Sequence, residues 1–192
     1  MKNMKNNLPL FNLNIDDCTI NTIDNNETMG LSFVNIPASL TEWLKFSDNS
    51  FKFKLDEDEK TITAHMFRAN YPIYRRIGEA EFNVQMDAKS VKNLCLKMMK
   101  QGTVNSINLE HKGEFTNEYA FLFESYILTD KHKILYPEFS DIENGSWIVS
   151  YKITNDAVWE AIKVGKFNGI SPEIPYDLIQ VEREYHNILN II

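Results

Sequence analysis

Apolar and polar side chains alternate along several short stretches of the chain, which is typical of strands with one buried face. Phe51, Phe53 and Leu55 are separated by lysines, and apolar positions resume over 61–67 after a charged segment at 56–60. Because a period of two puts every second side chain on the same face of a sheet, these two stretches predict a hairpin. Further strands are predicted over 81–86, 106–111, 119–128, 146–153 and 167–174.

Helical periodicity is present in two segments between these strands and in one near the end of the chain. Asp87 and Gly102 enclose a segment whose apolar residues recur every three or four positions. These residues are Val91, Leu94, Cys95, Met98 and Met99. Since Asp is a common N-cap and Gly a common residue after a helix, the segment predicts a helix from Asp87 to Gly102. A second helix is predicted from about 155 to Gly165, and a third over 177–192.

The order of these elements favours an α+β domain, because strands outnumber helices and many connections have hairpin length. We therefore expect a mostly antiparallel β-barrel or β-sheet flanked by two or three helices. Residues 1–30 are rich in Asn and Asp and show no sustained periodicity. They are interpreted as an arm or tail, with the folded domain spanning residues 31–192.

Composition narrows the classes of function. The 192 residues are 43% hydrophobic, enough for a real core, and 27 acidic side chains outnumber 20 basic ones to give a net charge of −7. That sign is opposite to the one expected of a protein that binds phosphate backbones. No apolar stretch is long enough to span a bilayer, and Cys18 and Cys95 form no close pair. We expect a soluble intracellular protein that binds neither nucleic acid nor membrane.

Motifs for cofactors and metals are missing from the sequence. None of the usual glycine-rich phosphate loops is present among the seven glycines. The four histidines lack the spacing of metal ligands; they are His65, His111, His132 and His186. The sequence therefore predicts neither a cofactor nor a metal site.

Five short motifs follow one another in the second half of the chain. They are Asn108-Leu109-Glu110-His111, Glu124-Ser125-Tyr126-Ile127, Gly145-Ser146-Trp147, Val158-Trp159 and Gly169-Ile170-Ser171-Pro172-Glu173. In this order and at this spacing the chain resembles the phage prohead (capsid maturation) serine proteases of the XkdF-like family. The resemblance runs from about residue 51 to residue 173, roughly two-thirds of the chain.

The resemblance implies a fold, an activity and a set of site residues. The fold would be of the herpesvirus assemblin type, and the activity that of an endopeptidase that cleaves scaffold and capsid proteins, and also itself, inside the procapsid. Carried over by motif, His111 would be the general base and Ser171 the nucleophile, since an imidazole can take the proton of a serine hydroxyl near neutral pH. Glu124 matches a family residue and ranks first as the third member, ahead of Glu173 and His186.

One departure from the family pattern affects the expected chemistry. Pro172 stands where the family usually has isoleucine, so the residue after Ser171 has no backbone N–H. Loss of one oxyanion donor costs about 3–4 kcal/mol, or about 10²–10³ in rate. The alternative to an active protease is therefore an inactive protease-like structural or scaffold-binding protein of the virion. Self-association into a homo-oligomer is compatible with the sequence.

Overall fold

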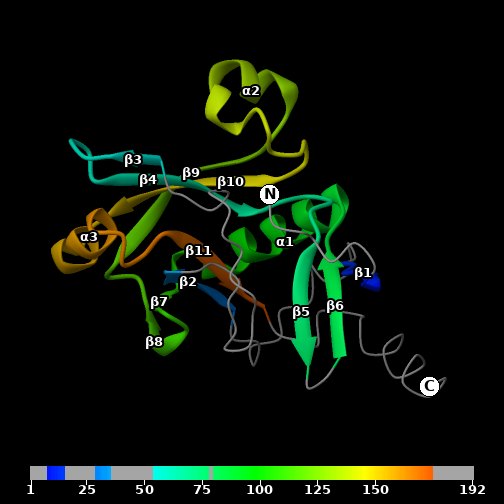
Figure 1. Ribbon diagram of the computed structural model, residues 1–192. Coiled ribbons are helices and arrows are strands. Elements are labelled where there is room, and N and C mark those ends of the chain that lie inside the picture. Colours follow the sequence, from blue (N-terminus) through cyan, green and yellow to red (C-terminus); the bar gives the residue numbers. More distant parts are fainter. Residues whose placement is uncertain (1–7, 16–28, 36–53, 78–79, 175–192) are drawn as a thin grey trace.

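The computed structural model describes residues 8–15, 29–35, 54–77 and 80–174 (Figure 1). Its strands are β1 (Leu10–Asn12), β2 (Gly30–Val34), β3 (Lys54–Asp56), β4 (Thr61–Phe67), β5 (Ile73–Ile77), β6 (Ala80–Gln85), β7 (Ile107–Leu109), β8 (Lys112–Thr116), β9 (Ala120–Ile127), β10 (Trp147–Ile153) and β11 (Gly169–Glu173). Its α-helices are α1 (Ala88–Gln101), α2 (Asp130–Leu135) and α3 (Asp156–Lys163), with short 3₁₀ turns at Thr103–Asn105 and Pro137–Phe139. The α+β class is confirmed.

The strands form separate sheets. One four-stranded sheet has the order β3-β4-β10-β9 and is antiparallel throughout. A second has the order β11-β2-β7-β8, in which only β2 and β7 are parallel, and the third joins β1, β6 and β5. Within the described residues each sheet keeps two free edges. The expected alternative of a closed barrel is therefore wrong, and the mostly antiparallel sheet is confirmed.

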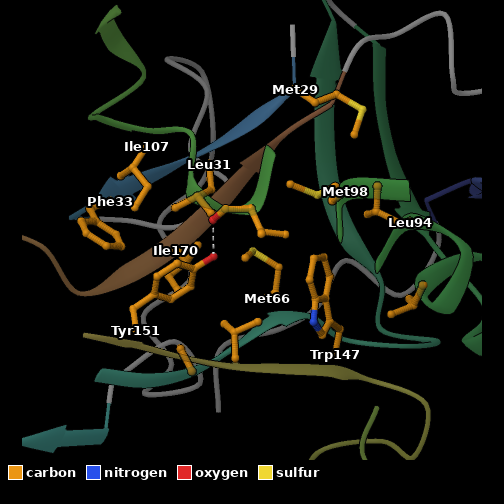
Figure 2. Packing of buried hydrophobic residues seen from close by; sticks show 14 of the residues in the cluster. Met29, Leu31, Phe33, Met66, Leu94, Met98, Ile107, Trp147, Tyr151 and Ile170 are labelled. Atoms are coloured by element: carbon orange, nitrogen blue, oxygen red, sulfur yellow. Dashed lines mark hydrogen bonds between the residues drawn. The ribbon is translucent and has the colours of Figure 1, made fainter. Parts of the chain in front are cut away.

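The main core lies between the two four-stranded sheets and against α1 (Figure 2). Leu31 and Phe33 of β2 face it from one side, and Trp147 and Tyr151 of β10 face it from the other. All four side chains are fully buried. The Tyr151 hydroxyl donates a hydrogen bond of 2.7 Å to the backbone oxygen of Val104, so its polar end is also satisfied inside the core.

The outer faces of the two sheets differ in polarity. Ile148 of β10 points away from the main core into a smaller apolar cluster with Leu128, Phe139 and Ile142 beneath α2. On β2 and β11 the alternation puts Ser32 and Ser171 on the face opposite Leu31, Phe33 and Ile170. This outer face of the second sheet therefore carries buried polar residues, and it contains the candidate site.

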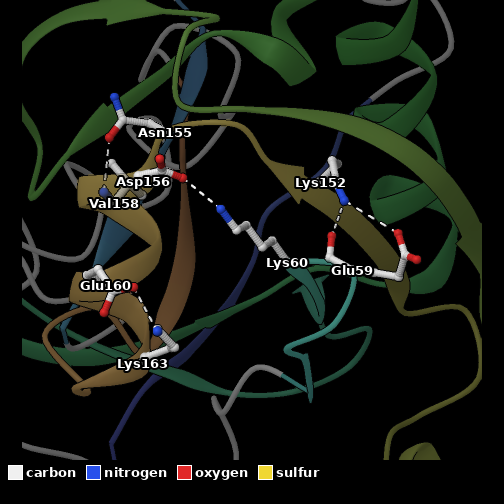
Figure 3. Close-up of polar contacts among 8 residues, drawn as sticks. All are labelled: Glu59, Lys60, Lys152, Asn155, Asp156, Val158, Glu160 and Lys163. Atoms are coloured by element: carbon white, nitrogen blue, oxygen red, sulfur yellow. Dashed lines mark hydrogen bonds and ion pairs between the residues drawn. The ribbon is translucent and has the colours of Figure 1, made fainter.

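Local capping signals fix α1 and α3 where the sequence predicts them. The side chain of Asp87 accepts a hydrogen bond of 2.7 Å from the Ser90 backbone N–H, and Gly102 ends α1 with a φ of 73°. The side chain of Asn155 caps α3 in the same way (Figure 3). Lys60 in the β3–β4 turn forms an ion pair with Asp156, which ties this turn to the start of α3.

Part of the predicted arm packs against the domain. Phe11 in β1, followed by Leu13 and Ile15, is buried, and β1 pairs in parallel with β6. Residues 1–7 and 16–28 lie outside the described residues, so a domain boundary at residue 30 stays a prediction. The predicted helix over 177–192, which includes His186, also lies outside them.

Burial controls the titration of His65 in β4. Its side chain is 9% exposed, and this burial, together with the charge of Arg68, lowers the pKa of the imidazole from 6.5 to about 4. Between pH 6.5 and pH 4 the unfolded chain therefore binds a proton at His65 that the folded protein does not. Folding stability must decrease as the pH falls through this interval.

Replacement of this imidazole should remove that part of the pH dependence. Since one pKa unit corresponds to about 1.4 kcal/mol, the wild type should lose about 3 kcal/mol more than His65→Gln between pH 7 and pH 4. Denaturant unfolding of both proteins across this range measures the difference. Parallel stability curves for the two proteins would contradict the assignment.

Candidate active site

Three polar side chains form one row across the second sheet. Ser171 of β11 is the register partner of Ser32 of β2, and Ser32 is the partner of Asn108 of β7. Residues in register share a face, so the three side chains lie side by side on the outer face, with neighbouring Cβ atoms about 5 Å apart. All three residues are buried. The Oδ1 atom of Asn108 accepts no hydrogen bond from the part of the chain that the structure describes, so this row contains an unused acceptor.

His111 lies in the tight turn that joins β7 to β8. Leu109 pairs with Lys112, and the two residues between them, Glu110 and His111, have φ values of 55° and 56°. Two consecutive left-handed residues make the turn that best fits the twist of a hairpin, although this conformation is uncommon for residues other than glycine. The turn aims the side chain of His111 at β11, two strands away.

Glu173 is the described acidic residue that contacts His111. Its Oε1 lies 3.0 Å from His111 Nδ1, and the two side chains are 29% and 22% exposed. Glu173 is two residues after Ser171, so both side chains lie on the same face of β11. This contact is not an aligned hydrogen bond, and the Oε1 atom accepts no hydrogen bond from the described residues.

Glu124 lies in the other four-stranded sheet. It sits on β9 opposite Ser150, and its Oε2 accepts a hydrogen bond of 2.7 Å from the Ser150 hydroxyl. Ser150 alternates along β10 with the core residues Val149 and Tyr151, so Glu124 and Ser150 lie on the outer face of that sheet. The main core therefore separates Glu124 from His111. The structure brings Glu173 to His111 and does not bring Glu124 there.

Ser171 lies within an edge strand. Its residue is 5% exposed, and no hydrogen bond joins it to His111 among the described contacts. Pro172 follows on β11, opposite Leu31. An edge strand tolerates proline because one row of its backbone groups has no partner strand. The site thus contains a serine, an imidazole and a carboxylate on one face, without a backbone N–H directly after the serine.

Other potentially reactive groups in the described residues do not join this site. Cys95 is half-buried on α1, and burial raises the pKa of its thiol to about 11, so the nucleophilic thiolate is scarce at neutral pH. His132 belongs to the capping box of α2. No group of three His, Cys, Asp or Glu side chains in the described ranges could hold a metal ion. None of the described helices is long and apolar enough to cross a membrane.

Two residues of the site region, Ser32 and Asn108, are not predicted from the sequence. Ser32 lies inside the apolar run Gly30-Leu31-Ser32-Phe33-Val34, and Asn108 lies in a motif read only for its histidine. The alternation of β2 could have placed Ser32 opposite Leu31 and Phe33. No sequence signal indicated that β2 lies between β7 and β11, since these pairings join segments about 75 and 140 residues apart.

Comparison with known proteins relates the chain to a protein family. A family model described as "Putative phage serine protease XkdF" matches residues 54–174, which is more than half of the chain. This range includes His111, Ser171 and Glu173 and excludes β2. A search of the curated proteins and a search of the solved structures found no significant match.

The contact between Glu173 and His111 can be tested without measuring protease activity. Glu173→Gln removes the charge beside Nδ1, so the ring resonances of His111 should shift in NMR spectra. Glu124→Gln is the matched control, and it should leave these resonances in place because the main core lies between the two residues. Equal shifts in both variants, or a shift only in the Glu124 variant, would contradict the observed geometry.

Proposed function

The chain belongs to the phage serine protease family XkdF, and on this premise we propose that it is a serine endopeptidase of phage head assembly. Its substrates would be the scaffold protein and the major capsid protein, with self-cleavage as a further reaction. The observation that carries the proposal is the placement of Ser171 and Glu173 on one face of β11, with His111 in contact with Glu173. A serine protease needs these three kinds of group on one surface.

The proposed reaction begins with attack by Ser171 on the scissile carbonyl. The Ser171 Oγ–H proton moves to Nε2 of His111 as the bond from Oγ to the carbonyl carbon forms. The tetrahedral intermediate then expels the amine of the leaving peptide, and the imidazolium donates its proton to that amine. A water molecule, deprotonated by His111, next attacks the carbonyl carbon of the acyl ester. The bond from that carbon to Ser171 Oγ then breaks, Oγ takes the proton back from His111, and the carboxylate product leaves.

In this mechanism Glu173 takes the role of the orienting residue. Its carboxylate beside Nδ1 favours the tautomer with the proton on Nδ1, which leaves Nε2 free to accept the serine proton. It also stabilises the imidazolium that forms during the reaction. The resemblance to the family ranks Glu124 first for this role. Glu173 takes the role here because its carboxylate contacts the His111 ring.

The environment proposed for this reaction is the procapsid inside the host bacterium. The partners would be assembly proteins, and the net charge of −7 gives no support to a role on nucleic acid. The assemblin-type fold and self-association of the chain stay predictions. No cofactor is needed for the chemistry described.

Pro172 favours a second candidate function. Without an N–H after Ser171, the oxyanion needs donors from elsewhere, and a chain that lacks them would be an inactive protease-like structural or scaffold-binding protein of the virion. The two candidates share a fold and partners and differ in chemistry, so a fold comparison does not separate them.

Cleavage in the presence of the partner proteins separates the two candidates. The chain should be co-expressed with the scaffold and capsid proteins from the same phage, and the products should be weighed by intact-mass spectrometry. Wild type should cut them, whereas Ser171→Ala and His111→Ala should each slow cleavage by at least about 10³-fold. The exposed Ser140→Ala and the half-exposed His132→Ala variants are controls that should cut like wild type.

Intact proteins in every sample, with a folded wild type bound to its partners, would support the structural protein instead. In that case Pro172→Ile tests whether the missing N–H is the cause. Recovery of cleavage in this variant would identify the lost oxyanion donor.

A further inference from the structure

Ser32 connects the strand of the proposed nucleophile to the turn that carries the proposed base. It lies at the centre of β2, between Leu31 and Phe33, whose side chains are fully buried in the main core. Its own side chain is on the opposite face and is also fully buried. The position of the Ser32 hydroxyl is therefore fixed by the packing of its two neighbours.

The Ser32 hydroxyl is bonded directly to the His111 backbone. Its Oγ accepts a hydrogen bond of 2.8 Å from the His111 N–H. β2 makes one more bond to the turn, from the Glu110 N–H to the Phe33 oxygen at 3.0 Å. The exposed Asn35, which follows β2, donates its backbone N–H to Glu110 Oε1 at 2.7 Å. Two hydrogen bonds from the buried strand and one from the residue after it thus hold the two-residue turn.

The turn needs such an attachment because of its backbone conformation. Glu110 and His111 both occupy the left-handed region, which is unfavourable for residues with a side chain, and such a conformation persists where surrounding contacts hold it. The bond from Ser32 is the one that acts on His111 itself. If this hydrogen bond is lost, the His111 backbone is no longer held by β2, and the imidazole can turn away from Glu173 and Ser171.

We propose that Ser32 is a positioning residue of the active site, which sets the orientation of His111 through the hydrogen bond to its backbone N–H. The inference rests on the proposed protease function. Ser32 also stands in register with Ser171, so one residue aligns the strand of the nucleophile and the turn of the base. Its role is distinct from that of Ser171, Glu173 and His111, which act on the reacting groups.

Ser146 offers a matched control for this role. It is fully buried like Ser32, and its Oγ accepts a hydrogen bond of 3.0 Å from the backbone N–H of Ala69, a residue 77 positions away. The corresponding separation between Ser32 and His111 is 79 positions. Ser32→Ala and Ser146→Ala therefore remove the same type of bond, and only the first bond reaches a residue of the proposed site.

The experiment measures labelling of Ser171 by a fluorophosphonate probe in the full chain, well below the unfolding temperature of each variant. The maximal labelling rate and the probe concentration at half-maximal rate are determined separately. Ser32→Ala should lower the maximal rate by about 10²-fold with the half-maximal concentration unchanged, since a misplacement of about 1 Å has an effect of this size. Ser146→Ala should label like wild type, and Ser32→Thr, which keeps the hydroxyl, should recover most of the rate.

The outcomes separate this inference from the function on which it rests. A labelled wild type with an equally fast Ser32→Ala variant overturns the positioning role and leaves the protease intact. Equal losses of rate in Ser32→Ala and Ser146→Ala overturn it as well, because the effect would then follow from general destabilisation. A wild type that is not labelled at Ser171 overturns the proposed function itself.

Discussion

The pairing of β2 with β11 on one side and β7 on the other is the constraint on which the rest of the structure depends. Every residue of β2 is buried, so the side chains on both faces of this strand lie inside the protein. Leu31 and Phe33 complete the core between the two large sheets, while Ser32 lies between Ser171 and Asn108. A slip of one residue would exchange the two faces, so the register that buries the core also assembles the site.

Elements with strong local signals could be predicted from the sequence. Asp87 caps the start of α1 and Gly102 ends it, as the sequence predicts. The strand predicted over 61–67 is observed as β4. Met99 belongs to the apolar periodicity of α1, yet the residue is 44% exposed in the structure. The closed barrel was also wrong, because closure depends on pairing between distant strands, which no local pattern specifies.

The candidate site, like the fold, could be predicted from the sequence only in part. His111 and Ser171 could be named from short motifs, but a motif does not say which carboxylate meets the imidazole. The resemblance to the family ranks Glu124 ahead of Glu173, whereas the structure brings Glu173 to the imidazole, because β9 and β11 belong to different sheets. Ser32 looks like one more position in an apolar strand until β7 is placed beside it. Tertiary pairing thus selects among residues of the same chemical type.

The late place of β11 in the sequence determines when the candidate site can form. Of the strands in the described ranges β11 comes last in the chain, and it carries both Ser171 and Glu173. During synthesis on the ribosome, β2, β7 and the His111 turn emerge long before it, and β11 must then close a loop of about 135 residues to reach β2. A nascent chain therefore contains His111 before it contains Ser171 or Glu173. Under the proposed mechanism, this order of strands would keep an unfinished polypeptide from attacking itself or its neighbours.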